Sequence, residues 1–162
     1  MIIIIFGVSG SGKTTIGQQL SSYLEIPFYD GDDFHPENSI QKMSKGIPLN
    51  DSDRAPWLSN LAQHLVQCEF NGGAILACSA LKASYRKQLS SQLKEVQWIF
   101  LRGSFDQLET RLEQRKNHFM KKEMLQSQFD TLEVPTYGLH VDISTPPYLI
   151  IQEIINYVIK TH

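Results

Sequence analysis

Short apolar runs alternate with longer amphipathic segments along this chain, and the alternation predicts an α/β fold. Strands are predicted at residues 2–6, 27–29, 74–80, 96–101 and 138–144. The run at 2–6 is apolar at every position, which is typical of a strand that is buried on both faces of a parallel sheet.

The segments between these strands have apolar residues at helical spacing. Helices are predicted from residue 13 until Pro27, and at 36–46, 51–70, 81–93, 105–115, 117–133 and 146–160. Strands that alternate with helices form right-handed βαβ units, so we expect a five-stranded parallel sheet with helices on both faces, in three layers. We expect one domain over residues 1–162.

Charge and composition narrow the functional classes. The 162 residues carry a net charge of −2, whereas a nucleic-acid or membrane surface usually shows a basic excess. No apolar stretch approaches the roughly 20 residues of a membrane helix, and no signal-peptide pattern is present. Cys68 and Cys78 give neither a disulfide framework nor a metal-ligand spacing, so we expect two buried thiols in a cytoplasmic protein.

The segment after the first strand has the spacing of a phosphate-binding loop. Residues 7–14, GVSGSGKT, match G-x-x-x-x-G-K-[ST] and lie between a buried strand and an amphipathic helix. Glycines let the backbone wrap closely around a phosphate, and the helix N-terminus adds a positive dipole end. Lys13 should reach the β- and γ-phosphates, and the Thr14 hydroxyl should ligate Mg²⁺. The residues expected to bind the nucleotide here are Gly7, Val8, Ser9, Gly10, Ser11, Gly12, Lys13, Thr14 and Thr15.

Acidic residues follow the second predicted strand, in the sequence YDGDDFHP. Ligands of parallel sheets bind at the carboxyl ends of the strands, so the candidates to face the phosphate loop are Asp30, Asp32, Asp33 and His35. One carboxylate can accept a hydroxyl proton and direct the oxygen at the γ-phosphorus, and another can hold Mg²⁺ through water. The alternative is a solvated acidic turn, which Asp and Gly favour. Because no N-K-x-D element of guanine-specific GTPases occurs, a small kinase is favoured.

Arg54 lies in the first turn of the predicted helix 51–70. The helix dipole disfavours a cation at that place, and a bound anion would resolve the conflict. The alternative is that Arg54 pairs with Asp51 or Asp53.

Polar groups also follow the third predicted strand, in the sequence CSALKASYR. Lys82 and Arg86 are four residues apart, which predicts one shared helix face that could hold a carboxylate or a phosphate. Ser79 lies at the strand edge. The alternative is a solvated basic face.

A cation-rich segment, RLEQRKNHFMKKE, begins at Arg111. Such a segment beside a phosphate loop can close over the triphosphate, where Arg111 and Arg115 would stabilise the charge of the transferring phosphoryl group. The alternative is a surface helix whose cations pair with Glu109 and Glu113.

Together these blocks resemble the gluconokinases (gluconate kinases), P-loop enzymes near shikimate kinase and the nucleoside monophosphate kinases. The resemblance runs from the phosphate loop to about Glu133, and Phe34 is a departure from an expected Leu. The matching motifs are GVSGSGKTT, DGDDFHP, KM..G.PLND.DR.PWL, CSALK..YR, RL..RK.HFM and SQF.TLE.

The resemblance implies the P-loop NTPase fold and ATP-dependent phosphorylation of D-gluconate at its 6-hydroxyl, with Mg²⁺, a small helical lid at about residues 117–133, and often a homodimer. It implies Asp32 as the base that orients the acceptor and Asp30 in the Mg²⁺ shell. Lys13, Asp32 and Arg115 would be catalytic, with Arg111 and Arg115 acting from the lid. The residues implied to bind gluconate are Asp32, His35, Arg54, Ser79, Lys82, Arg86 and His118.

Two other functions stay open. One is another small-molecule kinase, such as a shikimate-like or nucleotide kinase, although acids beside an arginine suit a flat base poorly. The other is a nucleotide-dependent switch that binds a partner and hydrolyses slowly, which would not need the acidic pocket.

Overall fold

The centre of the structure is a five-stranded parallel sheet. The computed structural model describes residues 1–115 and 122–162. The strands are β1 (Ile2–Phe6), β2 (Phe28–Asp30), β3 (Ala74–Cys78), β4 (Val96–Arg102) and β5 (Leu139–Asp142). They lie in the order β2-β3-β1-β4-β5, and all neighbours are parallel. The predicted parallel sheet of five strands is confirmed.

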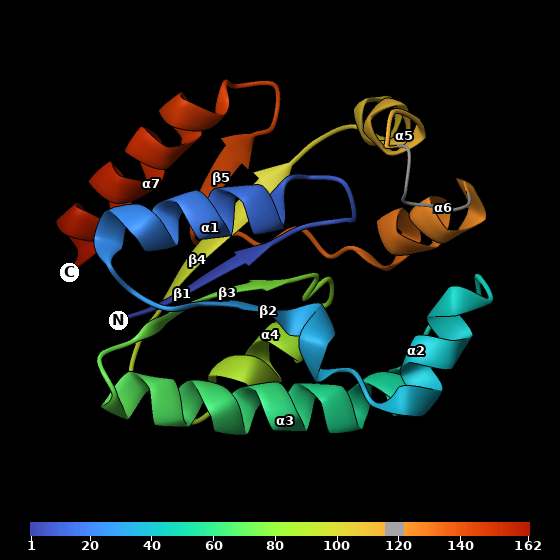
Figure 1. The fold of residues 1–162 in the computed structure, drawn as a ribbon, viewed down its shortest axis with the longest axis horizontal. Coiled ribbons are helices and arrows are strands. Elements are labelled where there is room, and N and C mark those ends of the chain that lie inside the picture. Colours follow the sequence, from blue (N-terminus) through green and yellow to red (C-terminus); the bar gives the residue numbers. More distant parts are fainter. Residues whose placement is uncertain (116–121) are drawn as a thin grey trace.

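Helices cover both faces of the sheet. They are α1 (Lys13–Leu24), the 3-10 turn η1 (Gly31–Phe34), α2 (Glu37–Ser44), α3 (Asp51–Phe70), α4 (Ala83–Ser90), α5 (Phe105–Glu113), α6 (Lys122–Thr131) and α7 (Pro147–Thr161). Figure 1 shows α1 and α7 over one face, and α3 and α4 over the other. In the part of the chain that the structure describes, no helix is long and apolar enough to cross a membrane.

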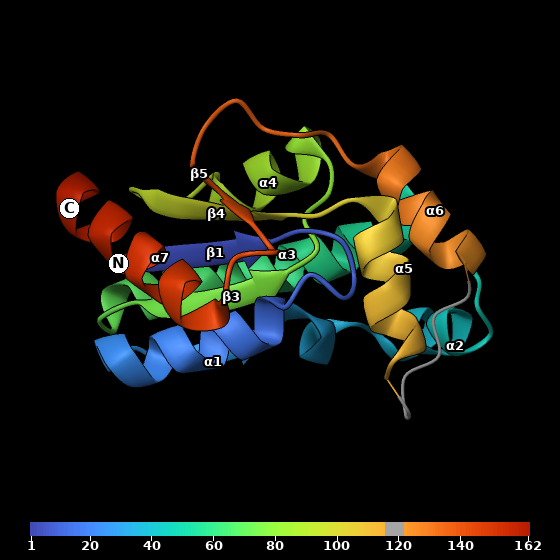
Figure 2. The ribbon, with the colours of Figure 1, turned by 90° about the horizontal axis from the view of Figure 1, so that it is seen from above.

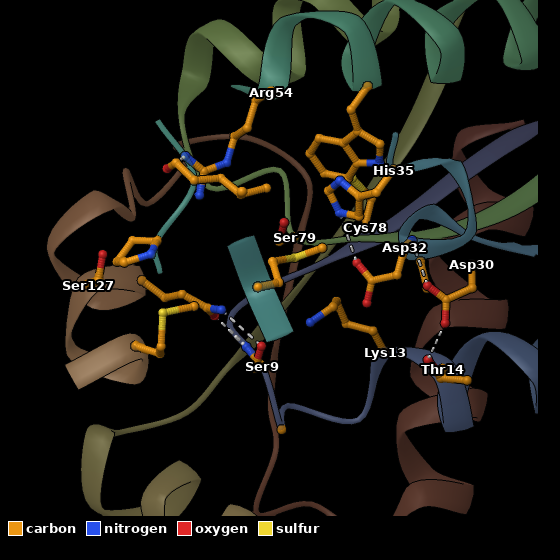
Figure 3. Close-up of a pocket in the computed structure, with 18 of the residues that line it drawn as sticks. Ser9, Lys13, Thr14, Asp30, Asp32, His35, Arg54, Cys78, Ser79 and Ser127 are labelled. Atoms are coloured by element: carbon orange, nitrogen blue, oxygen red, sulfur yellow. Dashed lines mark hydrogen bonds and ion pairs between the residues drawn. The ribbon is translucent and has the colours of Figure 1, made fainter. Parts of the chain in front are cut away.

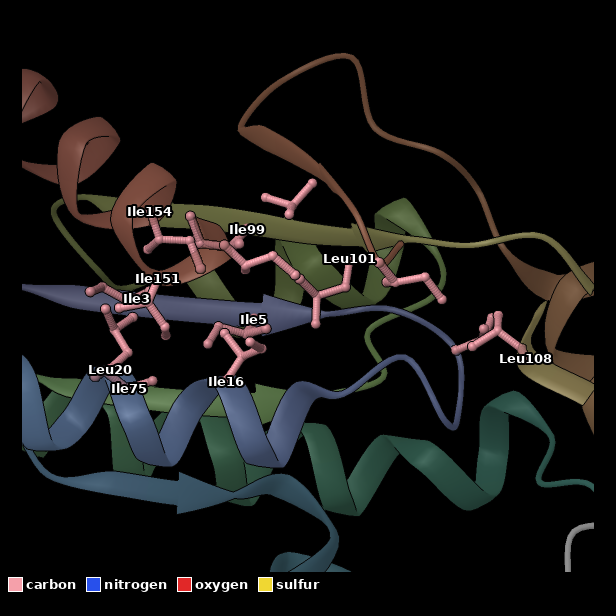
Figure 4. Close-up of a cluster of buried hydrophobic side chains, with 14 of the residues drawn as sticks. Ile3, Ile5, Ile16, Leu20, Ile75, Ile99, Leu101, Leu108, Ile151 and Ile154 are labelled. Atoms are coloured by element: carbon pink, nitrogen blue, oxygen red, sulfur yellow. The ribbon is translucent and has the colours of Figure 1, made fainter. Parts of the chain in front are cut away.

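The side chains of β1 build the core on both faces of the sheet. Ile3 and Ile5 pack with Leu20 of α1 in a cluster that also includes α7 (Figure 4). Ile4 and Phe6 belong to a second cluster with apolar residues of α3 and α4. Every residue of β1 is at most 1% exposed, which confirms a strand that is buried on both faces.

All strands point to the same edge of the sheet, and this edge carries the candidate chemistry. The chain leaves β1 into the phosphate loop, β2 into η1, and β3 into residues 79–82. Figure 2 shows α2, α5 and α6 beyond this edge, away from the two chain termini. The topology therefore brings segments together that are far apart in the sequence.

Arg86 on α4 is a buried structural residue. It is 2% exposed. Its guanidinium donates to the carbonyl oxygens of Ala80 (2.8 Å), Leu81 (3.1 Å) and Glu133 (2.8 Å), and its Nε donates to the Tyr137 hydroxyl. These bonds hold the segment after α6 against the segment that leads into α4.

The expectation that Lys82 and Arg86 share a ligand-binding helix face is therefore corrected. A shared face requires both residues to be helical, but Lys82 is the N-cap of α4 and precedes its first turn. Its Nζ lies 3.0 Å from the Asp51 carboxylate, whereas Arg86 points into the core. Four-residue spacing predicts a common face only after the helix start is known.

We expect Arg86→Met to lower the free energy of unfolding by about 3 kcal/mol, because buried carbonyl groups lose their donor. Urea unfolding measures this loss. Lys87 is exposed on the same helix, and Lys87→Met is a matched control with an expected change below about 0.5 kcal/mol. Equal losses in the two variants would contradict the structural role.

Candidate active site

A cavity of about 580 Å³ lies at the carboxyl edge of the sheet. Its wall combines the phosphate loop, η1, the segment between α2 and α3, the start of α3, the end of β3, and α6. Figure 3 shows Lys13, Asp32, Ser79 and Arg54 around this space, each from a different element. Cations that could bind anions, Lys13 and Arg54, and a carboxylate that could accept a proton, Asp32, therefore line one cavity.

The phosphate loop has the backbone that its glycines predict. Gly10 and Gly12 have φ angles of 83° and 97°, in the left-handed region that favours glycine. Gly12 is the N-cap of α1, and its side-chain-free position leaves the helix N-terminus open to an anion. The loop therefore presents backbone amides and a positive helix end at the cavity.

Lys13 is half-buried at the start of α1. Its Nζ donates to the carbonyl oxygens of Gly7 and Val8, at 3.0 Å each. Burial lowers the pKa of this lysine, and the carboxylates of Asp32 and Asp30 oppose the shift. The loop thus holds the ammonium group beside the place where phosphates would bind.

Thr14 and Asp30 provide neighbouring oxygen atoms. The Thr14 hydroxyl donates to Asp30 Oδ2 over 3.2 Å. Asp30 Oδ1 accepts from the Asp32 backbone N–H at 3.0 Å and so caps η1. A hydroxyl and a carboxylate next to a phosphate loop fit Mg²⁺, which prefers oxygen ligands and usually combines one or two carboxylates with phosphates and water.

Asp32 reaches the cavity from a rigid support. Its side chain is 79% exposed, and His35 Nε2 lies 3.4 Å from Asp32 Oδ1. The His35 side chain is only 4% exposed because its ring stacks on Trp57, with the ring centres 4.3 Å apart. The Trp57 indole donates to the Gly31 carbonyl at 2.7 Å. The turn that carries Asp32 is therefore fixed from two sides.

The cation at the start of α3 is directed into the cavity by neutral groups. Arg54 Nη1 donates to the Leu49 carbonyl at 2.6 Å and to the Tyr85 hydroxyl at 3.2 Å. Asp51 instead accepts from Lys82 and Tyr85. Asp53 pairs with Lys42 at 2.9 Å. The two acids of the first turn thus have other hydrogen-bonding partners, and Arg54 lines the cavity.

Most of the predicted site residues meet at this cavity. Those that line it are Ser9, Gly10, Gly12, Lys13, Thr14, Thr15, Asp30, Asp32, His35, Arg54, Ser79 and Arg115. Gly7, Val8 and Ser11 belong to the same loop, although they are not part of the lining. Lys82 lies in a shallow groove beside it. His118, with residues 117–121 of the predicted lid, lies outside the described residues.

Arg111 supports the phosphate loop instead of lining the cavity. Its Nη2 donates to the Ile143 carbonyl at 2.6 Å, and its Nη1 lies 3.5 Å from the Gly10 carbonyl oxygen. The alternative, in which cations of this segment pair with glutamates on the surface, holds for Lys122. Its Nζ lies 3.7 Å from the Glu109 carboxylate. A direct contact of Arg111 with nucleotide stays a prediction.

Some residues that line the cavity carry no sequence feature that predicts a role in the site. Trp57 is not among the predicted site residues, although it lines the cavity. Met124, Ser127 and Gln128 line the cavity from α6, and the last two belong to the SQF motif, to which no role was given. These side chains are neutral, so neither charge nor ligand chemistry marks them.

The start of α3 predicts a dependence of stability on pH. The Asn50 side chain accepts from the Asp53 N–H, and the Asp53 carboxylate accepts from the Asn50 N–H at 3.0 Å. The bond from Asn50, followed by that from Lys42, lowers the pKa of Asp53 below its ordinary value of 3.8. The stabilisation is therefore present above about pH 4 and is lost as the pH falls through the folded-state pKa.

We expect Asp53→Asn to reduce this acid-dependent loss, because an amide cannot titrate. Urea unfolding of the wild type and the variant at pH 7 and pH 3 measures the difference. The gap in stability between the two proteins should narrow at pH 3. A gap of the same size at both pH values would contradict the assignment.

Comparisons with known proteins agree on one family. The family model "Shikimate kinase" matches residues 9–158. A probable gluconokinase of Dictyostelium discoideum is 44% identical, with 97% of this chain and 86% of that protein covered. The thermoresistant gluconokinase of Escherichia coli K12 is 43% identical, with 90% and 86% covered.

A solved structure extends the similarity to three dimensions. The crystal structure of a gluconokinase from Sinorhizobium meliloti 1021 superimposes with a TM-score of 0.85 at 37% identity, over 99% of this chain and 97% of that one. The fold and the sequence thus agree over nearly the whole length. The chain belongs to the gluconokinase family of P-loop kinases, related to shikimate kinase.

Proposed function

We propose that this protein transfers the γ-phosphoryl group of ATP to the 6-hydroxyl of D-gluconate, giving 6-phospho-D-gluconate and ADP. One observation carries the proposal. Lys13 and the phosphate loop share a single cavity with the carboxylate of Asp32 and the guanidinium of Arg54. Family membership supports the choice of acceptor, because the curated relatives are gluconokinases.

The nucleotide side of the reaction is assigned to the loop and two cations. The loop amides and the N-terminus of α1 bind the β- and γ-phosphates. Lys13 stabilises the charge that develops on the transferring group, and Arg115, which lines the same cavity, can do the same. Oxygen atoms of Thr14 and Asp30 would hold Mg²⁺, which supplies charge neutralisation when it is bound.

The acceptor side is assigned to Asp32 and Arg54. Asp32 accepts the proton of the 6-hydroxyl while the hydroxyl oxygen bonds to the γ-phosphorus. The bond from the γ-phosphorus to the bridging oxygen breaks, and that oxygen leaves with ADP. Arg54 pairs with the carboxylate at the other end of gluconate, because a guanidinium forms bidentate bonds with a carboxylate. Ser79 and His35 line the same cavity and can bond the intermediate hydroxyls. A homodimer, which the family resemblance implies, and a cytoplasmic location, which the sequence composition indicates, stay predictions.

An acceptor panel tests the proposal. The purified protein is given ATP and Mg²⁺ with gluconate, shikimate or a nucleoside monophosphate, and ADP release is measured. We expect turnover on gluconate, because a site that bonds several hydroxyls discriminates strongly against acceptors without them. Turnover on shikimate alone would favour the second candidate, which the shikimate kinase family match supports. Acceptor-independent ADP release would favour a switch.

We expect Lys13→Ala to lower kcat by about 10²- to 10³-fold, because the transition state loses a positive charge. The fold should survive, since burial of this lysine already opposes its charged form. Steady-state kinetics measure the rate, and circular dichroism checks the fold. A folded variant with unchanged kcat would remove Lys13 from the reaction.

We expect Arg54→Ala to raise the KM for gluconate by at least about tenfold, with a smaller change in kcat, because carboxylate binding is lost in the ground state and the transition state alike. The KM for ATP should change little. A matched control is Lys45→Ala, which removes another cation of the cavity wall. This variant leaves intact the hydrogen bonds that orient Arg54. An unchanged gluconate KM in Arg54→Ala would refute the carboxylate assignment.

A further inference from the structure

The side chain of Gln128 on α6 holds the tip of the phosphate loop with both of its amide atoms. The Ser9 backbone N–H donates to Gln128 Oε1 at 2.7 Å. Gln128 Nε2 donates to Ser9 Oγ at 3.0 Å. The two residues are 119 positions apart, and Figure 3 shows Ser9 at the edge of the cavity with these bonds dashed. The contact is partly buried, so water competes with it only weakly.

The next residue of the phosphate loop, Gly10, is supported by α5. A side chain at Gly10 would meet Leu112 at 3.2 Å, so the loop backbone lies directly on that helix. Arg111 of the same helix reaches the Gly10 carbonyl. Ser9 precedes Gly10 in the loop, and its side-chain partner is Gln128 of α6 instead. The position of Ser9 in the loop therefore depends on where α6 lies.

The helix α6 also lines the cavity that holds Asp32 and Arg54. Met124 and Ser127 line the cavity together with Gln128. After the C-terminal end of α6, the Glu133 carbonyl accepts from Arg86, and the Glu133 carboxylate accepts from the Ala83 N–H. This end is fixed to the core. A ligand that contacts the middle of α6 therefore acts on a helix that is directly bonded to Ser9.

We propose that Gln128 is a positioning residue that couples acceptor binding to the phosphate loop through Ser9. The inference rests on the proposed function, since it takes gluconate as the acceptor. Gluconate bound in the cavity holds α6 in one position. Through its two bonds to Ser9, Gln128 then holds the phosphate loop in the conformation that binds the terminal phosphate. By linkage, nucleotide bound to the loop must raise the affinity for gluconate by the same factor by which gluconate raises the affinity for nucleotide. Gln128 itself need not touch the reacting atoms.

Binding measurements with the full chain test the coupling without turnover. The Kd of the non-hydrolysable ATP analogue AMP-PNP is measured by calorimetry with Mg²⁺, in the absence and presence of saturating gluconate. The variants are Gln128→Met, which keeps the length of the side chain but loses both bonds, and Gln128→Ala. The matched control is Gln126→Ala on the same helix, where Gln126 bonds only to Asp130 among the described residues, at 2.8 Å, and is exposed.

We expect gluconate to tighten AMP-PNP binding by about fivefold in the wild type and in Gln126→Ala, in the usual range of coupling between sites. In both Gln128 variants this factor should fall below about 1.5-fold. Their kcat should fall by about tenfold, as for the loss of hydrogen bonds that act in the transition state. The KM for gluconate should rise by no more than the lost coupling factor.

The outcomes separate the inference from the proposed function. Gluconate that binds and is phosphorylated, with the same coupling factor in Gln128→Met as in the wild type, overturns the inference alone. A lower melting temperature with unchanged coupling and kcat also overturns it, because Gln128 would then be only structural. A wild type that binds AMP-PNP but never gluconate overturns the proposed function and the inference together.

Discussion

The site depends on one backbone constraint: the chain must leave the central strand β1 and enter α1 with its amide groups turned towards the cavity. Gly10 and Gly12 supply the left-handed φ angles for this turn. The flanking elements supply rigidity, because β1 is almost fully buried and α1 packs on it through Ile16 and Leu20. The lysine that ends the loop is held by loop carbonyls, so its charge is placed by the same turn.

The parallel arrangement of the strands brings the other site residues next to this loop. Because every strand ends at the same edge, the acid-bearing turn after β2 and Ser79 after β3 lie beside the loop that follows β1. Repulsion among the carboxylates is limited by Lys13, which attracts Asp32 and Asp30, and by a nearby donor, since Asp30 accepts from Thr14. The site is thus a balance of charges on rigid elements, and a sugar acid that carries both hydroxyls and a carboxylate complements it.

Much of this could be predicted from the sequence, for identifiable reasons. Apolar runs gave the strands, and the loop motif gave the phosphate site, since both depend on local patterns. Arg86 could not be placed, because burial of a guanidinium depends on carbonyls of Ala80, Leu81 and Glu133 that only the fold brings together. Gln128 was missed because a neutral amide acts through geometry alone. Long-range contacts of neutral groups leave no mark on local spacing.

The most direct test of the central claim is a crystal structure of the protein with AMP-PNP, Mg²⁺ and gluconate bound together. The account predicts the triphosphate in the loop with Lys13 on its terminal groups, the 6-hydroxyl of gluconate between Asp32 and the γ-phosphorus, and its carboxylate on Arg54. A gluconate molecule that lies with its carboxylate towards the loop, or whose 6-hydroxyl lies away from Asp32, would contradict the account.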